Sequence, residues 1–148
     1  YLIRDDLELN SECNCPECQI ESLFVDFNGD EKYTLGCIYR HPNGNILHFA
    51  DALRRSCNKI KNHIPTIICG DINIDLIKSW HPKVKEYLET LEELQLLPLI
   101  TIPTRLTDET ATLIDHIYMR PSKKLANDNI KSGVLFCDIT DHFPTFLV

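Results

Sequence analysis

One short segment of the chain places a carboxylate and an amide two residues apart, directly after an apolar run. Asp71 and Asn73 follow the apolar residues 66–69 and Gly70. Because side chains alternate along an extended backbone, Asp71 and Asn73 share one face, where they could orient a water molecule and hold a phosphate oxygen. The alternative is that both residues only cap a turn, as Asp and Asn often do.

Two further segments pair an aspartate with a histidine. Asp115 and His116 lie inside the apolar stretch 113–119, where a carboxylate needs a partner because an unpaired buried charge is costly. His116 would point to the opposite face, so we interpret it as a core residue. Asp141 and His142 could supply a metal ligand and a group that contacts phosphate. Taken alone, Asp115 could form only a structural salt bridge, and the Asp141-His142 dipeptide is too common to indicate a site.

Hydrophobic periodicity predicts the elements that position these residues. Helical spacing of apolar residues predicts one helix over 46–62 and a second that starts at Pro82. Alternating or continuous apolar residues predict strands at 20–27, 33–39, 66–69, 113–119, 132–139 and 143–148. Strands outnumber helices, and hairpins mix with crossovers, so the expected class is α+β with mixed β-sheets. The polar residues fall at strand ends, where sites in such sheets form.

The bulk composition is that of one globular domain over residues 1–148, with 43% hydrophobic and 25% charged residues. The apolar runs are too short to span a bilayer, so we expect no membrane partner. Seven cysteines without a secretory signal favour a reducing, intracellular location. A net charge of −7 argues against nucleic-acid binding through a broad basic surface. It is compatible with an enzyme whose carboxylates bind a divalent cation.

Together the three polar segments resemble the endonuclease/exonuclease/phosphatase superfamily, which includes deoxyribonuclease I and the AP endonucleases. The segments keep the order of that family, and residues 38–43 look like its tyrosine-bearing loop. Pro103-Thr104-Arg105, ahead of the Asp115 strand, is most similar to the AP-endonuclease-like domains of non-LTR retrotransposon proteins. The resemblance runs from about residue 22 to residue 148. It implies part of a four-layer αββα sandwich, as in deoxyribonuclease I.

The resemblance also implies a metal-dependent phosphodiester hydrolase that nicks DNA. Asp71 would activate or orient the attacking water, while Asn73 and Tyr39 would hold the scissile phosphate. Thr140 stands where the family usually has Ser and keeps the hydroxyl, so we assign it to the phosphate as well. In-line attack on a phosphodiester requires such an aligned water, a cation and donors for the phosphate oxygens.

The third segment would complete the site. By resemblance, Asp141 binds Mg²⁺, which Mn²⁺ could replace, and His142 contacts the phosphate while Asp115 orients its imidazole. The expected substrate is DNA, the expected fusion partner is a reverse transcriptase in the same polyprotein, and the expected place of action is the nucleus. Two alternatives remain open: a catalytically inactive remnant of a mobile element, and a phosphatase of the same superfamily.

The N-terminal part of the chain departs from the family pattern. The family's Asn near the first strand and metal-binding Glu on the next have no counterpart, because Glu12, Glu17 and Glu21 lack the family context. We therefore expect the chain to lack the N-terminal strands of the domain and to be weakly active alone. Cys13, Cys15 and Cys18 could suggest zinc, but a structural site needs a fourth ligand. We favour a polar loop there.

Overall fold

The computed structural model describes residues 1–4, 20–121 and 130–148, and within them a mixed sheet forms the centre of the molecule. Its strand order is β1-β2-β3-β4-β8-β5. The strands are β1 (Leu2–Ile3), β2 (Ile20–Asn28), β3 (Lys32–Arg40), β4 (Thr66–Asp71), β5 (Leu97–Pro98) and β8 (Asp115–Arg120). β3 and β4 are parallel, and the other neighbouring pairs are antiparallel. The carboxyl ends of β3 and β4 therefore meet the amino end of β8 at one edge.

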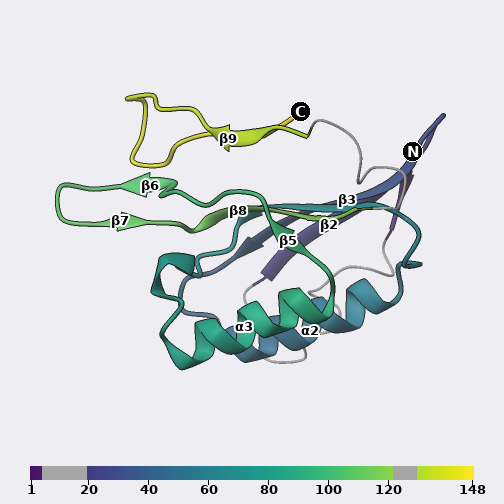
Figure 1. The fold of residues 1–148 in the computed structure, drawn as a ribbon, viewed down its shortest axis with the longest axis horizontal. Coiled ribbons are helices and arrows are strands. Elements are labelled where there is room, and N and C mark those ends of the chain that lie inside the picture. Colours follow the sequence, from purple (N-terminus) through teal and green to yellow (C-terminus); the bar gives the residue numbers. More distant parts are fainter. Residues whose placement is uncertain (5–19, 122–129) are drawn as a thin grey trace.

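Two helices cover one face of this sheet (Figure 1). Helix α2 (Ile46–Asn58) connects the parallel strands β3 and β4, as such a crossover requires. Asn45 caps its first turn by accepting hydrogen bonds from the backbone N–H groups of Leu47 and His48. Helix α3 (Pro82–Glu93) begins with proline, which suits a first helical position because its missing N–H has no partner there.

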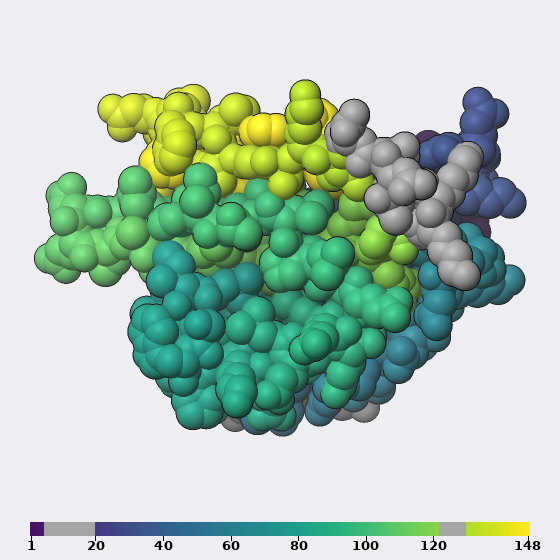
Figure 2. Space-filling model, viewed as in Figure 1, coloured from purple at the N-terminus to yellow at the C-terminus, as the bar shows by residue number. Residues whose placement is uncertain are grey.

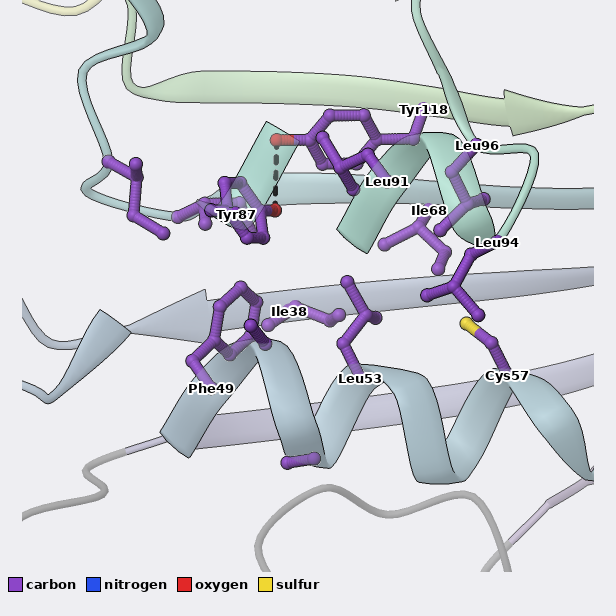
Figure 3. Packing of buried hydrophobic residues seen from close by; sticks show 14 of the residues in the cluster. Ile38, Phe49, Leu53, Cys57, Ile68, Tyr87, Leu91, Leu94, Leu96 and Tyr118 are labelled. Atoms are coloured by element: carbon purple, nitrogen blue, oxygen red, sulfur yellow. Dashed lines mark hydrogen bonds between the residues drawn. The ribbon is translucent and has the colours of Figure 1, made fainter. Parts of the chain in front are cut away.

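The hydrophobic core lies between these helices and the sheet (Figure 3). Alternate residues of β3 and β4, such as Ile38 and Ile68, point toward the helices and are at most 1% exposed. Helix α2 contributes Phe49 and Leu53, which are equally buried. The hydroxyl groups of Tyr87 and Tyr118 are 3.1 Å apart within this core, so each buried phenol has a polar partner.

Shorter strands lie on the other face. β9 (Ser132–Val134) and β10 (Thr145–Leu147) form an antiparallel ladder over the sheet, away from the helices (Figure 1). A second ladder, β6 (Arg105–Leu106) with β7 (Ala111–Thr112), projects beyond the edge where β4 ends. Figure 2 shows the C-terminal residues stacked above the sheet and the β6–β7 segment protruding beside them. A 3-10 helix, η2 (Leu76–Lys78), follows β4.

The α+β class with a mixed sheet is confirmed, as are the strands and helices that periodicity predicts, with changes at their ends. The strand expected over 132–139 is wrong beyond Val134, because β10 offers three residues of pairing and the chain then turns away. Phe136 and Ile139 are 72% and 83% exposed. The first helix ends at Asn58, short of the predicted residue 62, where the backbone N–H groups of Lys59 and Ile60 turn back to the carbonyl oxygens of Ser56 and Cys57. No helix in the described part of the chain is long and apolar enough to cross a membrane.

Candidate active site

Asp71 is the last residue of β4, and the glycine before it is a geometric necessity. Gly70 has φ +142°, and a Cβ atom built on it would lie 1.9 Å from the carbonyl oxygen of Ile38. Only glycine allows β4 to pass so close to β3 in this conformation. Across the sheet, Asp71 is in register with Asp115 of β8. The sheet thus sets the two carboxylates side by side at its edge.

Asp71, Asp115 and His142 form one cluster. One ligand atom from each residue lies within 4.8 Å of the others, and all three side chains are partly buried. His142 Nδ1 is 3.0 Å from Asp115 Oδ2 and 3.2 Å from Oδ1. An imidazole N–H donates at this distance to a carboxylate, which fixes the tautomer and orientation of the ring. The contact between Asp115 and the His142 ring that the sequence predicts is present.

Thr104 fixes the side chain of Asp115 through a hydrogen bond. Its hydroxyl donates to Asp115 Oδ2 at 2.7 Å and accepts from the backbone N–H groups of Ile114 and Asp115, at 3.2 and 3.0 Å. Thr104 is completely buried. A single hydroxyl therefore satisfies two backbone donors and one carboxylate oxygen, so the Asp115 side chain cannot turn away from His142 without breaking this bond.

The surroundings of Asp71 raise the pKa of its carboxyl group. Burial raises its pKa, and the neighbouring negative charge of Asp115 raises it further. The His142 charge and hydrogen bonding by Asn73 oppose this shift. The Oδ1 atom of Asp71 is buried and has no hydrogen-bond partner among the described residues. One oxygen of this carboxylate is therefore free to accept a hydrogen bond inside the cluster.

Asn73 and Tyr39 flank this carboxyl. Asn73 has φ +53°, a left-handed conformation that Asn tolerates better than most residues, and its Nδ2 donates to the carbonyl oxygen of Arg40 at 2.9 Å. Tyr39 lies one residue before the end of β3, the strand next to β4, and is 42% exposed. The sheet brings both residues to the edge where β4 ends. Their roles toward a phosphate stay a prediction.

Asp141 lies beside the cluster rather than within it. Its Oδ2 accepts from Arg105 Nε at 2.7 Å, and this ion pair lowers the pKa of Asp141. Thr140 forms a tight turn with His142, accepting from its backbone N–H at 3.1 Å and donating to its carbonyl oxygen at 2.9 Å. Thr140 therefore shapes the segment that presents His142. The metal-binding role of Asp141 and the phosphate role of Thr140 also stay predictions.

His116 is a core residue, as the alternation of β8 indicates. It is 1% exposed, its Nε2 is 3.1 Å from the carbonyl oxygen of Leu113, and its Nδ1 meets the hydroxyl of Tyr118. Burial lowers its pKa to about 4. The ring is therefore neutral and bonded at both nitrogens. The three N-terminal cysteines, Glu12 and Glu17 lie outside the described residues, whereas Glu21 is an exposed residue of β2.

The fold and the cluster define an endonuclease/exonuclease/phosphatase protein, and the family follows from a direct match. The family model described as endonuclease-reverse transcriptase matches residues 33–146, so the chain belongs to this family. The resemblance read from the sequence is thereby confirmed. A comparison with curated proteins gave no match.

Solved structures share the deoxyribonuclease I-like sandwich fold. The endonuclease domain of TRAS1, a telomere-specific non-LTR retrotransposon, has 20% identity and a TM-score of 0.67, over 85% of this chain and 60% of that one. A mannosyl-6-phosphatase from Bacteroides thetaiotaomicron has 16% identity and a TM-score of 0.56, over 87% of this chain and 56% of that one. Beta toxin from Staphylococcus aureus, a double mutant with bound magnesium ions, has 13% identity and a TM-score of 0.56, over 88% of this chain and 57% of that one. The chain thus spans 56–60% of the length of these proteins.

Three residues at the site had no role in the sequence interpretation: Arg40, Thr104 and Arg105. Arg40 had a readable signal, because it continues the alternation that puts Thr34 and Ile38 of β3 into the core, and a charged residue at such a position calls for an explanation. Thr104 and Arg105 stood out only as part of a family-like segment. Their partners are 11 and 36 residues away, and no local pattern identifies such pairs.

Proposed function

We propose that this chain carries the catalytic residues of a metal-dependent phosphodiester hydrolase that nicks DNA. The observation that carries this proposal is the convergence of Asp71, Asp115 and His142 at the edge where β4 ends. The family description and the retrotransposon neighbour support DNA as the substrate and a reverse transcriptase as the fusion partner. They also support action in the nucleus, where DNA is found.

The Asp115–His142 pair would serve the phosphate. With Nδ1–H donating to Asp115, the Nε2 atom of His142 is left to contact a phosphate oxygen. A carboxylate in the position of Asp115 orients the ring toward the phosphate, so the pair can contact negative charge that develops there. Tyr39 is proposed to bind the same phosphate, because a hydroxyl group can donate to its oxygens. Asn73 and Thr140 are proposed to frame it, since the Asn73 amide donates to the carbonyl oxygen of Arg40 and the Thr140 hydroxyl to that of His142.

Asp71 would orient the attacking water and accept its proton. The buried Oδ1 without a partner is the atom to which a water hydrogen would be donated. Burial and Asp115 raise the pKa of Asp71, which makes its carboxylate a stronger base than an exposed aspartate. The pKa is still that of a carboxyl group, so activity requires the ionised form and is lost on acidification.

A divalent cation fits the donor set of this site. Hard cations such as Mg²⁺ prefer carboxylate oxygens, and the cluster holds two carboxylate side chains, those of Asp71 and Asp115. Asp115 is committed to His142 and Thr104, and the proposed role of Asp71 is toward water. Asp141 is exposed and bound to Arg105 by a surface ion pair, an interaction weak enough for a cation to replace. We propose Asp141 as the ligand for Mg²⁺, or Mn²⁺ in its place, which when bound would neutralise charge on the phosphate.

A phosphatase of the same superfamily is the second candidate. The mannosyl-6-phosphatase neighbour has a similar fold, and a fold does not choose the substrate. The same cluster could serve a phosphomonoester. Supercoiled plasmid and a phosphomonoester, offered separately to the same preparation, would separate the two activities. An inactive remnant of a mobile element would process neither substrate.

A plasmid-nicking assay tests the proposal. In the complete domain, Asp71→Asn and His142→Ala should remove most turnover in Mg²⁺ while leaving the fold intact. Asp30→Asn and His63→Ala are matched controls, since both residues are exposed and lie at the other end of the sheet. Full nicking by the Asp71→Asn protein would contradict the assignment. We further propose that residues 1–148 alone nick weakly, and robust EDTA-sensitive nicking by them would contradict that point.

A further inference from the structure

Arg40 is a buried guanidinium whose hydrogen bonds converge on the segment that follows Asp71. It is 1% exposed, although it is the largest of the fully buried side chains. Nε donates to the carbonyl oxygen of Ile72 and Nη2 to that of Asn73, both at 2.7 Å. Nη1 donates to the carbonyl oxygen of Gly44 at 2.6 Å. Each of the three guanidinium nitrogens therefore binds a backbone carbonyl.

The contact is reciprocal. While Arg40 holds the carbonyl oxygens of Ile72 and Asn73, the side chain of Asn73 donates back to the carbonyl oxygen of Arg40 at 2.9 Å. Asn73 has φ +53°, and a residue other than glycine keeps this left-handed conformation only where surrounding contacts hold it. The bonds from Arg40 supply such contacts. They determine the backbone conformation of the segment that directly follows Asp71.

Within the described residues, no salt bridge cancels the charge of Arg40. Among the described residues, no carboxylate oxygen lies within 4 Å of its guanidinium. Asp71 is the carboxylate whose negative charge acts on it most clearly, since it raises the pKa of Arg40 against the lowering caused by burial. A buried cation bound only to carbonyl groups is expensive to retain. Such an arrangement is expected where the planar guanidinium group and its charge both serve a functional site.

Arg120 provides an internal comparison. It is the other buried arginine, 4% exposed, and lies at the opposite end of the sheet. Its Nη2 donates to Thr66 Oγ1 at 3.1 Å and, at 3.4 Å, to the carbonyl oxygen of Ile60, while its Nε has no partner. Arg120 is thus loosely bonded. The short, complete set of bonds at Arg40 is a property of the site and does not follow from burial alone.

We propose that Arg40 is a positioning residue of this active site. It fixes the backbone of residues 72 and 73, the segment that directly follows Asp71, and it adds a permanent positive charge whose field reaches the Asp71 carboxyl. This inference rests on the proposed function for its catalytic consequence, whereas its structural consequence is independent of any activity. Removal of the guanidinium fork should loosen the segment after Asp71 without altering the surface that DNA would contact.

Two variants and one control test the proposal. Arg40→Met removes the charge and keeps the volume, Arg40→Lys keeps the charge and loses the fork, and Arg120→Met controls for loss of a buried arginine. Amide hydrogen exchange of residues 72–75, measured on the 148-residue chain, should rise at least about tenfold in both Arg40 variants, the exchange factor that a local loss of about 1.4 kcal/mol produces. Arg120→Met should leave exchange of this segment unchanged.

The kinetic arm uses the complete domain. Nicking by the Arg40 variants should show kcat reduced about 100-fold, the cost of misplacing a reacting group by roughly 1 Å, with KM for DNA within about twofold of the wild type. Equal exchange of residues 72–75 in Arg40→Met and Arg120→Met would overturn the proposal. If Arg40→Met does not fold, Arg40→Lys decides by the same measurements. Unaltered nicking by Asp71→Asn would refute the proposed function alone, since the exchange measurement does not depend on activity.

Discussion

Replacing Thr104 by valine tests whether the Asp115–His142 pair is held from behind by one hydroxyl. Valine has nearly the volume of threonine but cannot hydrogen-bond. The change removes a donor to a carboxylate, a bond that contributes about 1.5–3 kcal/mol. It also leaves two backbone N–H groups, those of Ile114 and Asp115, without their acceptor in a fully buried place. Each buried N–H group without an acceptor costs about 1–3 kcal/mol, so the low ends of these ranges already give about 3.5 kcal/mol of destabilisation.

Urea unfolding of the chain measures this effect. Thr104→Val should lower the midpoint with an unchanged m-value, as expected for a change in stability alone. Thr104→Ser keeps the hydroxyl and should cost only about 1 kcal/mol for the lost methyl group. Thr101→Val is the surface control, and its effect should stay within about 0.5 kcal/mol because Thr101 is exposed. A cost below about 1 kcal/mol for Thr104→Val would refute the reasoning.

Three further predictions use the same unfolding measurement. Because burial lowers the pKa of His116 to about 4 from 6.5, the unfolded state takes up this proton first. The stability that the neutral His116 ring contributes is complete above pH 6.5 and is lost as the pH falls toward 4. This loss of stability is about 3 kcal/mol, and the His116→Gln protein should not show it. Burial and the charge of Asp115 raise the pKa of Asp71, so its ionised form opposes folding at pH 7. Asp71→Asn should therefore stabilise the chain at pH 7, and this advantage should be lost as the pH falls through the raised pKa of Asp71. Gly70→Ala should cost at least about 3 kcal/mol, because its Cβ would collide with the Ile38 carbonyl. Equal pH dependence with and without His116, destabilisation by Asp71→Asn at pH 7, or a mild Gly70→Ala effect would contradict these three predictions respectively.

The sequence predicts the parts of the fold and site that local periodicity encodes. Alternation along β8 separates Asp115, which faces the cluster, from His116, which faces the core. The apolar run that stops at Gly70 predicts a strand end with Asp71 at the sheet edge. Convergence with His142 needed more than periodicity, because 71 residues separate it from Asp71, and the order of motifs in a known family supplied that link.

The parts that could not be predicted depend on partners that no pattern marks. Arg40 binds carbonyl oxygens, which every residue has, so its targets leave no trace in the sequence. Thr104 finds Asp115 only when the chain between them doubles back as β6 and β7. The strand expected to continue to Ile139 has the composition of a strand but only three residues of β10 to pair with. Pairing, rather than propensity, decides where a strand ends.

The most direct test of the central claim is nicking of supercoiled plasmid by the complete domain in Mg²⁺, as wild type, Asp71→Asn and His142→Ala, with EDTA controls. The account predicts EDTA-sensitive nicking by the wild type and a loss of at least about 100-fold in each variant, the scale on which general acid–base groups contribute. Thermal or urea unfolding should show that both variants remain folded. Undiminished nicking by the folded Asp71→Asn or His142→Ala protein would contradict the assignment of this cluster as the active site.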